Sequence, residues 1–378
     1  MLTKAGAGRH VFPLSIAFGS TLLMVGYRFL IGAGLDAFLA NPEDNFAYTA
    51  LAYQAMQGKI LFSDLYTWET HPAAYFNLYY LVLGNLSRLT GLPVITLFVC
   101  LGIIASAIVI FFIYHISRIA GFTEGAARWS VVLVAFSSGI SVVGYIAGFP
   151  VIAGADLRHL DAILFSSFYT SPYQTFAFAS QSIVILLILR CEQKPTGARF
   201  ISLAVAQVWL VLTRPYDWFL LFAGLSGSIA FAGSAWRVRG RILLLLGSLT
   251  LPVVGYNYWL SRLPAWSNFA EISLSQQMFR LYWILGYGYI LVLALIGCWL
   301  TFRNEDFRNG RWLAVSALVS IMLLVVFNVP QVKLASCGPL FFCVLGGAGL
   351  HFLKQRLSMN PVLGSSFILL SVPLLLFT

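Results

Sequence analysis

The sequence predicts an all-α fold, a polytopic bundle of membrane-spanning helices. Only 10% of the 378 residues are charged, and 60% are apolar or aromatic, whereas soluble domains carry roughly 25% charged residues. With so few charged side chains, a globular protein of this size has too little polar surface, so lipid must cover it. Apolar runs of the length that a spanning helix needs, about 20 residues, recur from one end of the chain to the other.

Hydropathy predicts about eleven such helices in one transmembrane domain, residues 1–378, with helix ends uncertain by about four residues. We expect a retained first helix rather than a cleaved signal peptide, because Lys4 and Arg9 precede it and no small-residue cleavage site follows. The chain ends within an apolar run, which suggests that a short tail is missing. The expected spans are 11–33, 93–115, 128–147, 171–190, 200–214, 216–235, 242–260, 281–301, 311–329, 334–353 and 361–378.

The first two spans are separated by a long loop, 34–92, whose last part admits two interpretations. If residues 73–90 formed a span, every later connection would change sides of the membrane. We favour an amphipathic helix at the outer interface, because Tyr75, Tyr79 and Tyr80 suit the headgroup region.

Charge bias favours this layout. Most of the 23 Lys and Arg residues fall at the N-terminus and in every second connection, within 118–128, 190–199, 237–241, 303–311 and 354–356. The acids on the opposite side or at its boundary are Asp36, Glu43, Asp44, Asp64, Glu69, Asp156, Asp161, Asp217 and Glu271. The positive-inside rule therefore predicts a cytoplasmic N-terminus and an extracytoplasmic loop 34–92. The same clustering explains the net charge of +10 without a nucleic-acid partner.

Several classes of site are excluded by the absence of their motifs. The five cysteines form no CxxC pair, so neither a disulfide framework nor a zinc site is indicated. No Walker-type loop, dinucleotide fingerprint or HExxH helix is present. Because the predicted cytoplasmic connections are short, we expect chemistry at the outer face or within the membrane.

Polar residues concentrate in the first outer loop. Asn41 or Asp44 is placed to cap a short helix that ends at Gly58. Glu43 and Asp44 would then lie at the positive end of the helix dipole, which favours the ionised carboxylate. The alternative is that both acids only cap a helix on a solvated loop.

In order and spacing, residues 34–120 resemble the GT-C glycosyltransferases, membrane enzymes that use polyprenyl-phosphate sugars. The matching pieces are Glu43-Asp44 after Pro42, Tyr48, Ala55-Met56-Gln57-Gly58, Phe62-Ser63-Asp64-Leu65-Tyr66 and His71-Pro72-Ala73. The chain departs from the family pattern at His71, where a lysine often stands before two prolines. A second acidic residue is common just before the fourth span, where this chain has Tyr169-Thr170-Ser171-Pro172. Asp156 and Asp161 lie upstream and are alternatives for it.

The resemblance implies transfer of a sugar from a polyprenyl-phosphate donor to a glycan, lipid or protein acceptor outside the cytoplasm, usually with inversion. It implies Asp44 as the catalytic base, with Glu43 as the alternative carboxylate. Cations for the donor phosphate would come from His71, Lys59, Arg214, Lys333, Arg158 and Arg280, and substrate-lining groups from Tyr48, Asp64, Tyr66 and Asp161. No metal ligand is assigned, although a divalent metal stays possible.

Alternatives remain for two of these cations and for the function as a whole. Arg214 has a salt-bridge partner within reach in Asp217, and Lys333 can extend to the interface. Two alternative functions are a flippase or carrier for a lipid-linked sugar, which would transport the sugar without transferring it, and a non-catalytic partner in cell-envelope glycan assembly. A carrier would be expected to show internal repeats and charged residues at mid-membrane, whereas the predicted membrane centres are nearly free of charge except at Arg28. We expect a bacterial inner-membrane location, and the oligomeric state stays open.

Overall fold

The computed structural model of the chain describes residues 4–37, 42–65, 70–136, 164–263, 266, 280–325 and 338–357. Within these ranges the structure is helical, and the β structure is confined to one bridge between Phe62 and Tyr75. The α-helices are α1 (Lys4–Leu30), α2 (Pro42–Met56), α3 (Leu78–Thr90), α4 (Val94–Ile119), α5 (Glu124–Phe136), α8 (Leu164–Thr170), α9 (Pro172–Gln193), α10 (Gly197–Thr213), α11 (Trp218–Gly227), α12 (Trp236–Leu260), α14 (Arg280–Arg303), α15 (Arg311–Val325) and α17 (Pro339–Arg356). Short 3₁₀ helices are η3 (Ile229–Phe231), η4 (Gly233–Ala235) and η5 (Glu305–Gly310).

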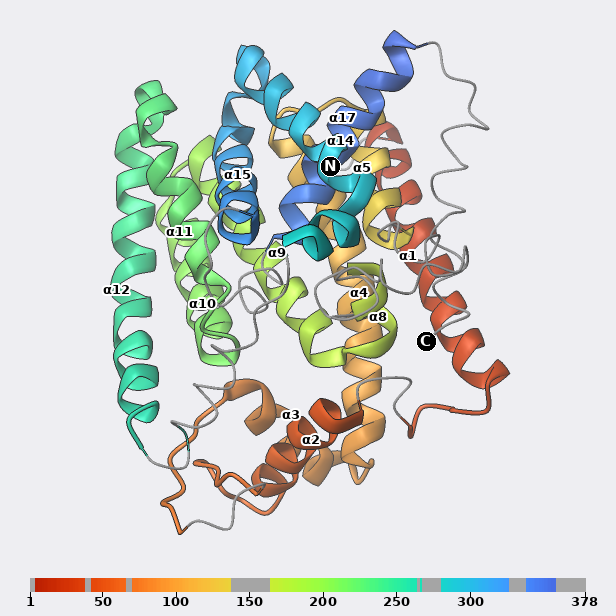
Figure 1. Cartoon of the computed structure of the whole chain (residues 1–378), viewed down its shortest axis with the longest axis vertical. Helices are drawn as coiled ribbons and strands as arrows, with labels where there is room; N and C mark the ends of the chain where they lie inside the picture. Colours follow the sequence, from red (N-terminus) through yellow and green to blue (C-terminus); the bar gives the residue numbers. More distant parts are fainter. Residues whose placement is uncertain are drawn as a thin grey trace.

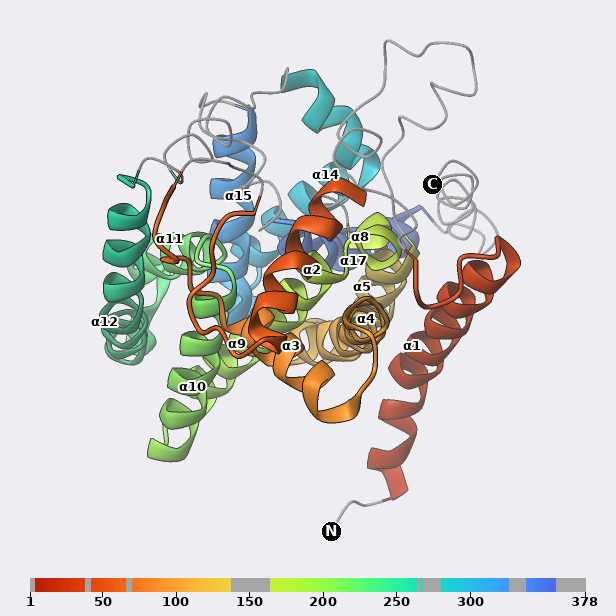
Figure 2. The ribbon, with the colours of Figure 1, turned by 90° about the horizontal axis from the view of Figure 1, so that it is seen from below.

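The long helices run up and down through one bundle, and α2 and α3 lie together at its lower end (Figure 1). The helices α4, α5, α9, α14 and α17 make the most extensive contacts with one another and form its centre. Viewed from below, α1 and α12 lie at opposite edges, with α2 and α3 across the middle of the bundle (Figure 2). The first loop therefore covers one end of the bundle.

Five helices in the described part of the chain are long and apolar enough to cross a membrane: His10–Leu30, Val94–Ile119, Pro172–Gln193, Trp236–Leu260 and Trp283–Arg303. α10, at 17 residues, and α11, at 10 residues, are shorter but apolar. The fold class is thus confirmed as an all-α membrane bundle. The predicted span 361–378, and the end of the span predicted at 128–147, lie outside the described residues.

The predicted span 216–235 is not one continuous α-helix. α11 ends at Gly227 and is followed by the tighter turns η3 and η4. Two carbonyl groups of this segment accept hydrogen bonds from arginines, Ser228 from Arg239 at 3.0 Å and Ala232 from Arg308 at 2.9 Å. Each of these carbonyls also accepts a backbone N–H of the 3₁₀ turns at 3.0 Å, from Phe231 and Ala235 respectively, so the arginine side chains add a second hydrogen bond to each.

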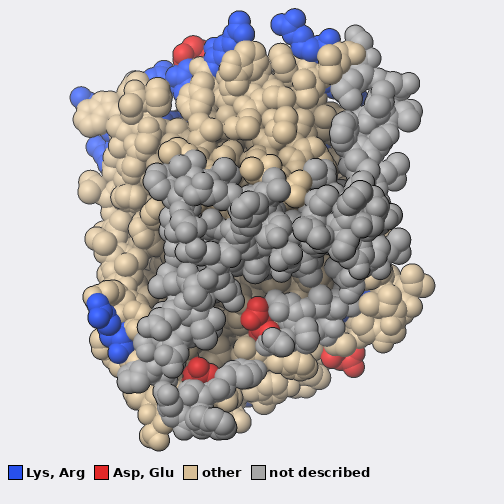
Figure 3. Space-filling model, viewed as in Figure 1, with Lys and Arg blue, Asp and Glu red and all other residues tan. Residues whose placement is uncertain are grey.

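The described residues separate by charge along the long axis. Most of the Lys and Arg residues visible in Figure 3 lie at its upper end, and acidic residues appear mainly in its lower half. Arg239 also forms an ion pair with Glu192 near the upper end, and both side chains are only 1% exposed. The connections that carry these basic clusters are the ones that the sequence places on one side of the membrane.

Candidate functional site

The first loop has an apolar core of its own, separate from the core of the bundle. It consists of buried residues from α2, α3, the start of α4 and the connection between α2 and α3, among them Phe62, Tyr79, Leu83 and Phe98. At 13 residues, α3 is shorter than the roughly 20 residues that a span needs. The interpretation of 73–90 as a helix outside the membrane core agrees with this length, although the helix begins only at Leu78.

Specific contacts hold this loop in one conformation. The Gln54 amide clamps the segment after α2 because its Nε2 donates to the Ser63 carbonyl and its Oε1 accepts from the Ser63 N–H, both at 2.9 Å. At the crossing of α2 and α3, a Cβ atom added to Gly84 would lie 2.2 Å from the Ala52 carbonyl oxygen. Only glycine permits this approach of the two backbones. The first loop is therefore a packed unit that can hold side chains in fixed positions.

The acidic pair lies in the first turn of α2. Pro42 opens the helix, so Asp44 is inside the first turn and is not the residue that caps it. Asp44 is exposed, while the side chain of Glu43 lies outside the described residues. The helix dipole favours negative charge at this position. Gly58, with φ of +89°, follows the end of α2 as the sequence predicts.

A buried amide next to Asp44 connects α2 to the bundle. Asn45 is fully buried, and its Nδ2 donates a hydrogen bond of 3.0 Å to the carbonyl of Thr170, the last residue of α8. Thr170 belongs to the segment Tyr169–Pro172, where the family that the first loop resembles often carries a second acidic residue. The structure thus brings the acidic pair of the first loop close to this segment, although Asn45 and Thr170 are 125 residues apart.

A second amide connects α3 to the end of α10. Asn77 caps α3 by accepting from the Tyr79 N–H at 3.0 Å, and its Nδ2 donates to the Thr213 carbonyl at 2.8 Å. The Tyr173 hydroxyl, in the first turn of α9, donates to the same carbonyl. Tyr48 packs against Tyr173 with ring centroids 4.8 Å apart. Residues from α2, α3, α9 and α10 therefore converge around Tyr173.

Arg214 follows Thr213 directly and is placed by these contacts. It is 6% exposed, and its Nε lies 3.6 Å from Oδ1 of Asp217, which is fully buried. The salt bridge that the sequence offered as an alternative is therefore present. Asp44 and Arg214 are each adjacent to a residue that is hydrogen-bonded to the segment Thr170–Tyr173.

The tyrosines of α3 are not acid–base groups at ordinary pH. Tyr79 and Tyr80 are each 1% exposed, and burial, which disfavours the phenolate, raises the pKa of both well above the usual value. They form a neutral aromatic wall beside Tyr173, with ring centroids 5.3 and 5.4 Å from its ring.

Asp64 and His71 form a separate group further along the loop. The Asp64 N–H donates to Nε2 of His71 at 2.9 Å, so this nitrogen is an acceptor and cannot also donate to a phosphate. The His71 ring lies edge-on to Trp266 with centroids 6.3 Å apart. On the other side, the Tyr256 hydroxyl of α12 donates to the Ala74 carbonyl.

The remaining candidates are not brought to the Asp44 end of α2 by the described structure. Lys59 is exposed beyond the other end of this helix, and at about 1.5 Å of rise per residue it lies roughly 20 Å along the axis from Asp44. The side chains of Tyr66, Arg158, Asp161, Arg280 and Lys333 lie outside the described residues. Within the described residues, no group of three or more His, Cys, Asp or Glu side chains is placed to hold a metal ion.

Asn45 and Asn77 are the site-building residues that the sequence does not single out. Both are buried amides that bond to carbonyl groups far away in the chain. Asn77 carried a local signal, because an asparagine directly before an amphipathic helix is a favoured N-cap. Asn45 carried none, since its partner is set by tertiary packing.

Comparison with known proteins identifies similar folds but no similar sequences. No protein-family model and no curated protein sequence matches the chain. The oligosaccharyltransferase of Archaeoglobus fulgidus, solved with a tethered acceptor peptide, matches with a TM-score of 0.60 and 12% identity over 100% of this chain and 54% of its own length. ArnT from Cupriavidus metallidurans, solved with bound undecaprenyl phosphate, matches with a TM-score of 0.55 and 14% identity over 92% of this chain and 60% of its own.

The archaeal oligosaccharyltransferase AglB from Archaeoglobus fulgidus, solved with an inhibitory peptide and a dolichol-phosphate, matches with a TM-score of 0.52 and 12% identity over 97% of this chain and 54% of its own. The chain thus spans little more than half the length of these proteins. Identities this low establish the arrangement of the helices and leave the chemistry to be argued from the site. The chain has the fold of the GT-C membrane glycosyltransferases, as the order of residues in its first loop predicts.

Proposed function

We propose that the chain is a glycosyltransferase that moves a sugar from a polyprenyl-phosphate donor to an acceptor on the extracytoplasmic face of the membrane. In this proposal Asp44 is the general base, and inversion at the anomeric carbon follows from a single displacement. The similar structures share the fold of this chain, and the proposed chemistry rests on the residues of the site.

The observation that carries the proposal is the pair of links to the segment Thr170–Tyr173, where α8 ends and α9 begins. Asn45, beside Asp44, bonds to the Thr170 carbonyl, and Tyr173 bonds to the Thr213 carbonyl, beside Arg214. A transferase that uses a lipid phosphate needs a carboxylate for the acceptor and a cation for the departing phosphate. The two links anchor one group of each kind to the same short segment.

The proposed reaction follows from these two charges. The Asp44 carboxylate takes the proton of the acceptor hydroxyl or amide while the acceptor atom attacks the anomeric carbon of the sugar. The bond from that carbon to the phosphate oxygen breaks, and its electron pair leaves with the polyprenyl phosphate. The Arg214 guanidinium stabilises the negative charge that develops there, because charge-assisted hydrogen bonds to phosphate are the strong ones. The part of the reaction assigned to Glu43, Arg158, Arg280 and Lys333 stays a prediction from the sequence.

The test is transfer by the purified full chain in proteoliposomes, supplied with a polyprenyl-phosphate sugar and a panel of glycan, lipid and peptide acceptors. We expect Asp44→Asn to lower the turnover number by about 10²–10⁴-fold, which is the usual contribution of a general base. Asp36→Asn is the matched control, because Asp36 is an exposed acid before α2 and its loss should leave turnover unchanged.

Two results would change the assignment. Full transfer by Asp44→Asn would remove Asp44 as the base. Movement of the labelled donor across the bilayer without transfer to any acceptor would instead favour the flippase or carrier function.

A further inference from the structure

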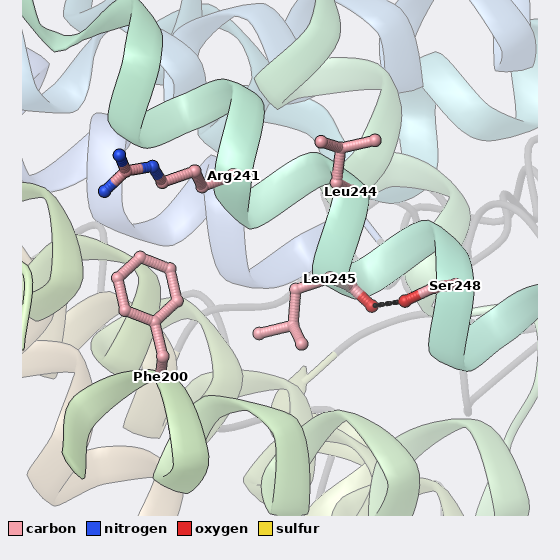
Figure 4. Close-up of a pocket in the computed structure, with 5 residues that line it drawn as sticks. All are labelled: Phe200, Arg241, Leu244, Leu245 and Ser248. Carbon is pink, nitrogen blue, oxygen red and sulfur yellow. Dashed lines mark hydrogen bonds between the residues drawn. The ribbon is translucent and has the colours of Figure 1, made fainter. Parts of the chain in front are cut away.

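A groove on the side of the bundle lies apart from the proposed active site. It is formed between α10 and α12, has a volume of about 560 Å³ and is lined by Phe200, Arg241, Leu244, Leu245 and Ser248 (Figure 4). The groove is open to the surroundings, and Leu244 and Ser248 on its wall are exposed. Phe200 lies in the first turn of α10 and Arg241 in the second turn of α12, so the groove lies toward the end where the basic connections gather.

The walls of the groove are suited to hydrocarbon. Leu244 and Leu245 present aliphatic surface, and Phe200 adds a ring from the facing helix (Figure 4). The hydroxyl of Ser248 donates to the Leu245 carbonyl at 3.0 Å, so it is satisfied within its own helix. Deeper in the bundle, Gln207 of α10 donates to Thr250 of α12 at 2.9 Å and holds the two helices together.

Arg241 provides the charge at one end of the groove. It is exposed, and the ion pairs among the described residues do not include it. Neighbouring arginines are engaged: Arg239 is paired with Glu192, Arg237 lies over the Trp236 ring, and Arg199 donates to the carbonyls of Arg190 and Lys194. A guanidinium next to an apolar groove is complementary to a molecule with a phosphate at one end and a hydrocarbon chain at the other.

We propose that this groove is a binding site for an anionic phospholipid of the surrounding membrane. The lipid phosphate pairs with Arg241, and one acyl chain lies along Phe200 and Leu245. Basic pockets between membrane helices are a recognised way to bind anionic headgroups, with each basic residue contributing about 1 kcal/mol. The planar guanidinium also matches a phosphate in two-point contacts.

Native mass spectrometry of the full chain in detergent, titrated with phosphatidylglycerol or phosphatidylcholine, tests the proposal. We expect Arg241→Gln to weaken phosphatidylglycerol binding about fivefold, which corresponds to about 1 kcal/mol. Arg237→Gln removes the same charge outside the groove and should leave binding unchanged. Ser248→Trp keeps Arg241 but fills the groove at an exposed position, and it should abolish the tightly held lipid.

Three outcomes would overturn the proposal. The first is an equal loss of lipid in Arg241→Gln and Arg237→Gln, which would indicate general surface charge. The second is equal binding of phosphatidylcholine. The third is displacement of phosphatidylglycerol from the groove by undecaprenyl phosphate at equimolar concentration, which would make the occupant a prenyl lipid.

Discussion

Replacement of Asn45 by alanine tests whether the contact between α2 and the end of α8 positions the proposed base. Asn45 is fully buried, and its amide nitrogen lies 3.0 Å from the Thr170 carbonyl oxygen. Removing one partner of a buried hydrogen bond costs about 1–3 kcal/mol. We expect this cost to appear as a looser first turn of α2, which carries Asp44.

The turnover number should respond more strongly to Asn45→Ala than the free energy of unfolding does. A displacement of about 1 Å of a catalytic group can lower a rate about 10²-fold. For Asn45→Ala we therefore expect the turnover number to fall by about 10–100-fold, while the KM for the lipid donor changes little. Thr49→Val is the control, because Thr49 is buried in the same helix and its hydroxyl bonds only to carbonyls of that helix, Asn45 and Phe46.

The assay measures initial rates at saturating donor, together with the midpoint of thermal unfolding in the same detergent. A structural role alone predicts a lower midpoint with unchanged turnover of the folded fraction. If Asn45→Ala keeps the wild-type turnover number under conditions where Asp44→Asn is inactive, the contact with Thr170 does not position the base. A fall in turnover with Thr49→Val as large as with Asn45→Ala would also refute the argument.

Three further changes test the packing. Gly84→Ala should lower the midpoint of thermal unfolding, because the new Cβ would lie 2.2 Å from the Ala52 carbonyl oxygen and overpacking costs about 1–3 kcal/mol. The control is Gly26→Ala, at a helical position with open space, which should leave the midpoint unchanged or raise it. Gln54→Leu breaks both bonds to Ser63 and should speed amide exchange of residues 59–65, whereas unchanged protection would contradict the clamp. Glu192→Gln leaves the buried Arg239 charge without its counter-charge and should lower the free energy of unfolding by about 3–5 kcal/mol. The double variant with Arg239→Gln should recover part of this loss. Full additivity of the two single changes would show that the two side chains act independently.

The sequence predicts the framework of this protein because membrane helices are specified locally. Each span satisfies its own backbone hydrogen bonds, so an apolar run of sufficient length is enough to locate it. The same holds for the first loop, where a proline, two acids and a later glycine mark the start and end of α2. One difference falls at α11, which gives way to two 3₁₀ turns whose carbonyls also accept hydrogen bonds from Arg239 and Arg308.

The geometry of the site is less accessible from the sequence. The partners of Asn45 and Asn77 are 125 and 136 residues away, and no local pattern specifies them. The ion pair of Arg214 with Asp217 spans only three positions, so it could be foreseen as an alternative to phosphate binding. A salt bridge in this position does not exclude that role, since a guanidinium has five N–H donors.

The separate core of the first loop bears on how the proposed site works. Catalytic geometry must be held to within about 0.5 Å, which requires rigid elements and supporting contacts. Here Asp44 lies on a helix, and this helix packs on α3 through a backbone contact at Gly84. The loop is in turn fastened to α8, α10 and α12 through Asn45, Asn77 and Tyr256. Spans that are remote in sequence therefore help to position Asp44, the proposed base, so we expect a change in the packing of α9 or α10 to alter the proposed transfer without touching a substrate.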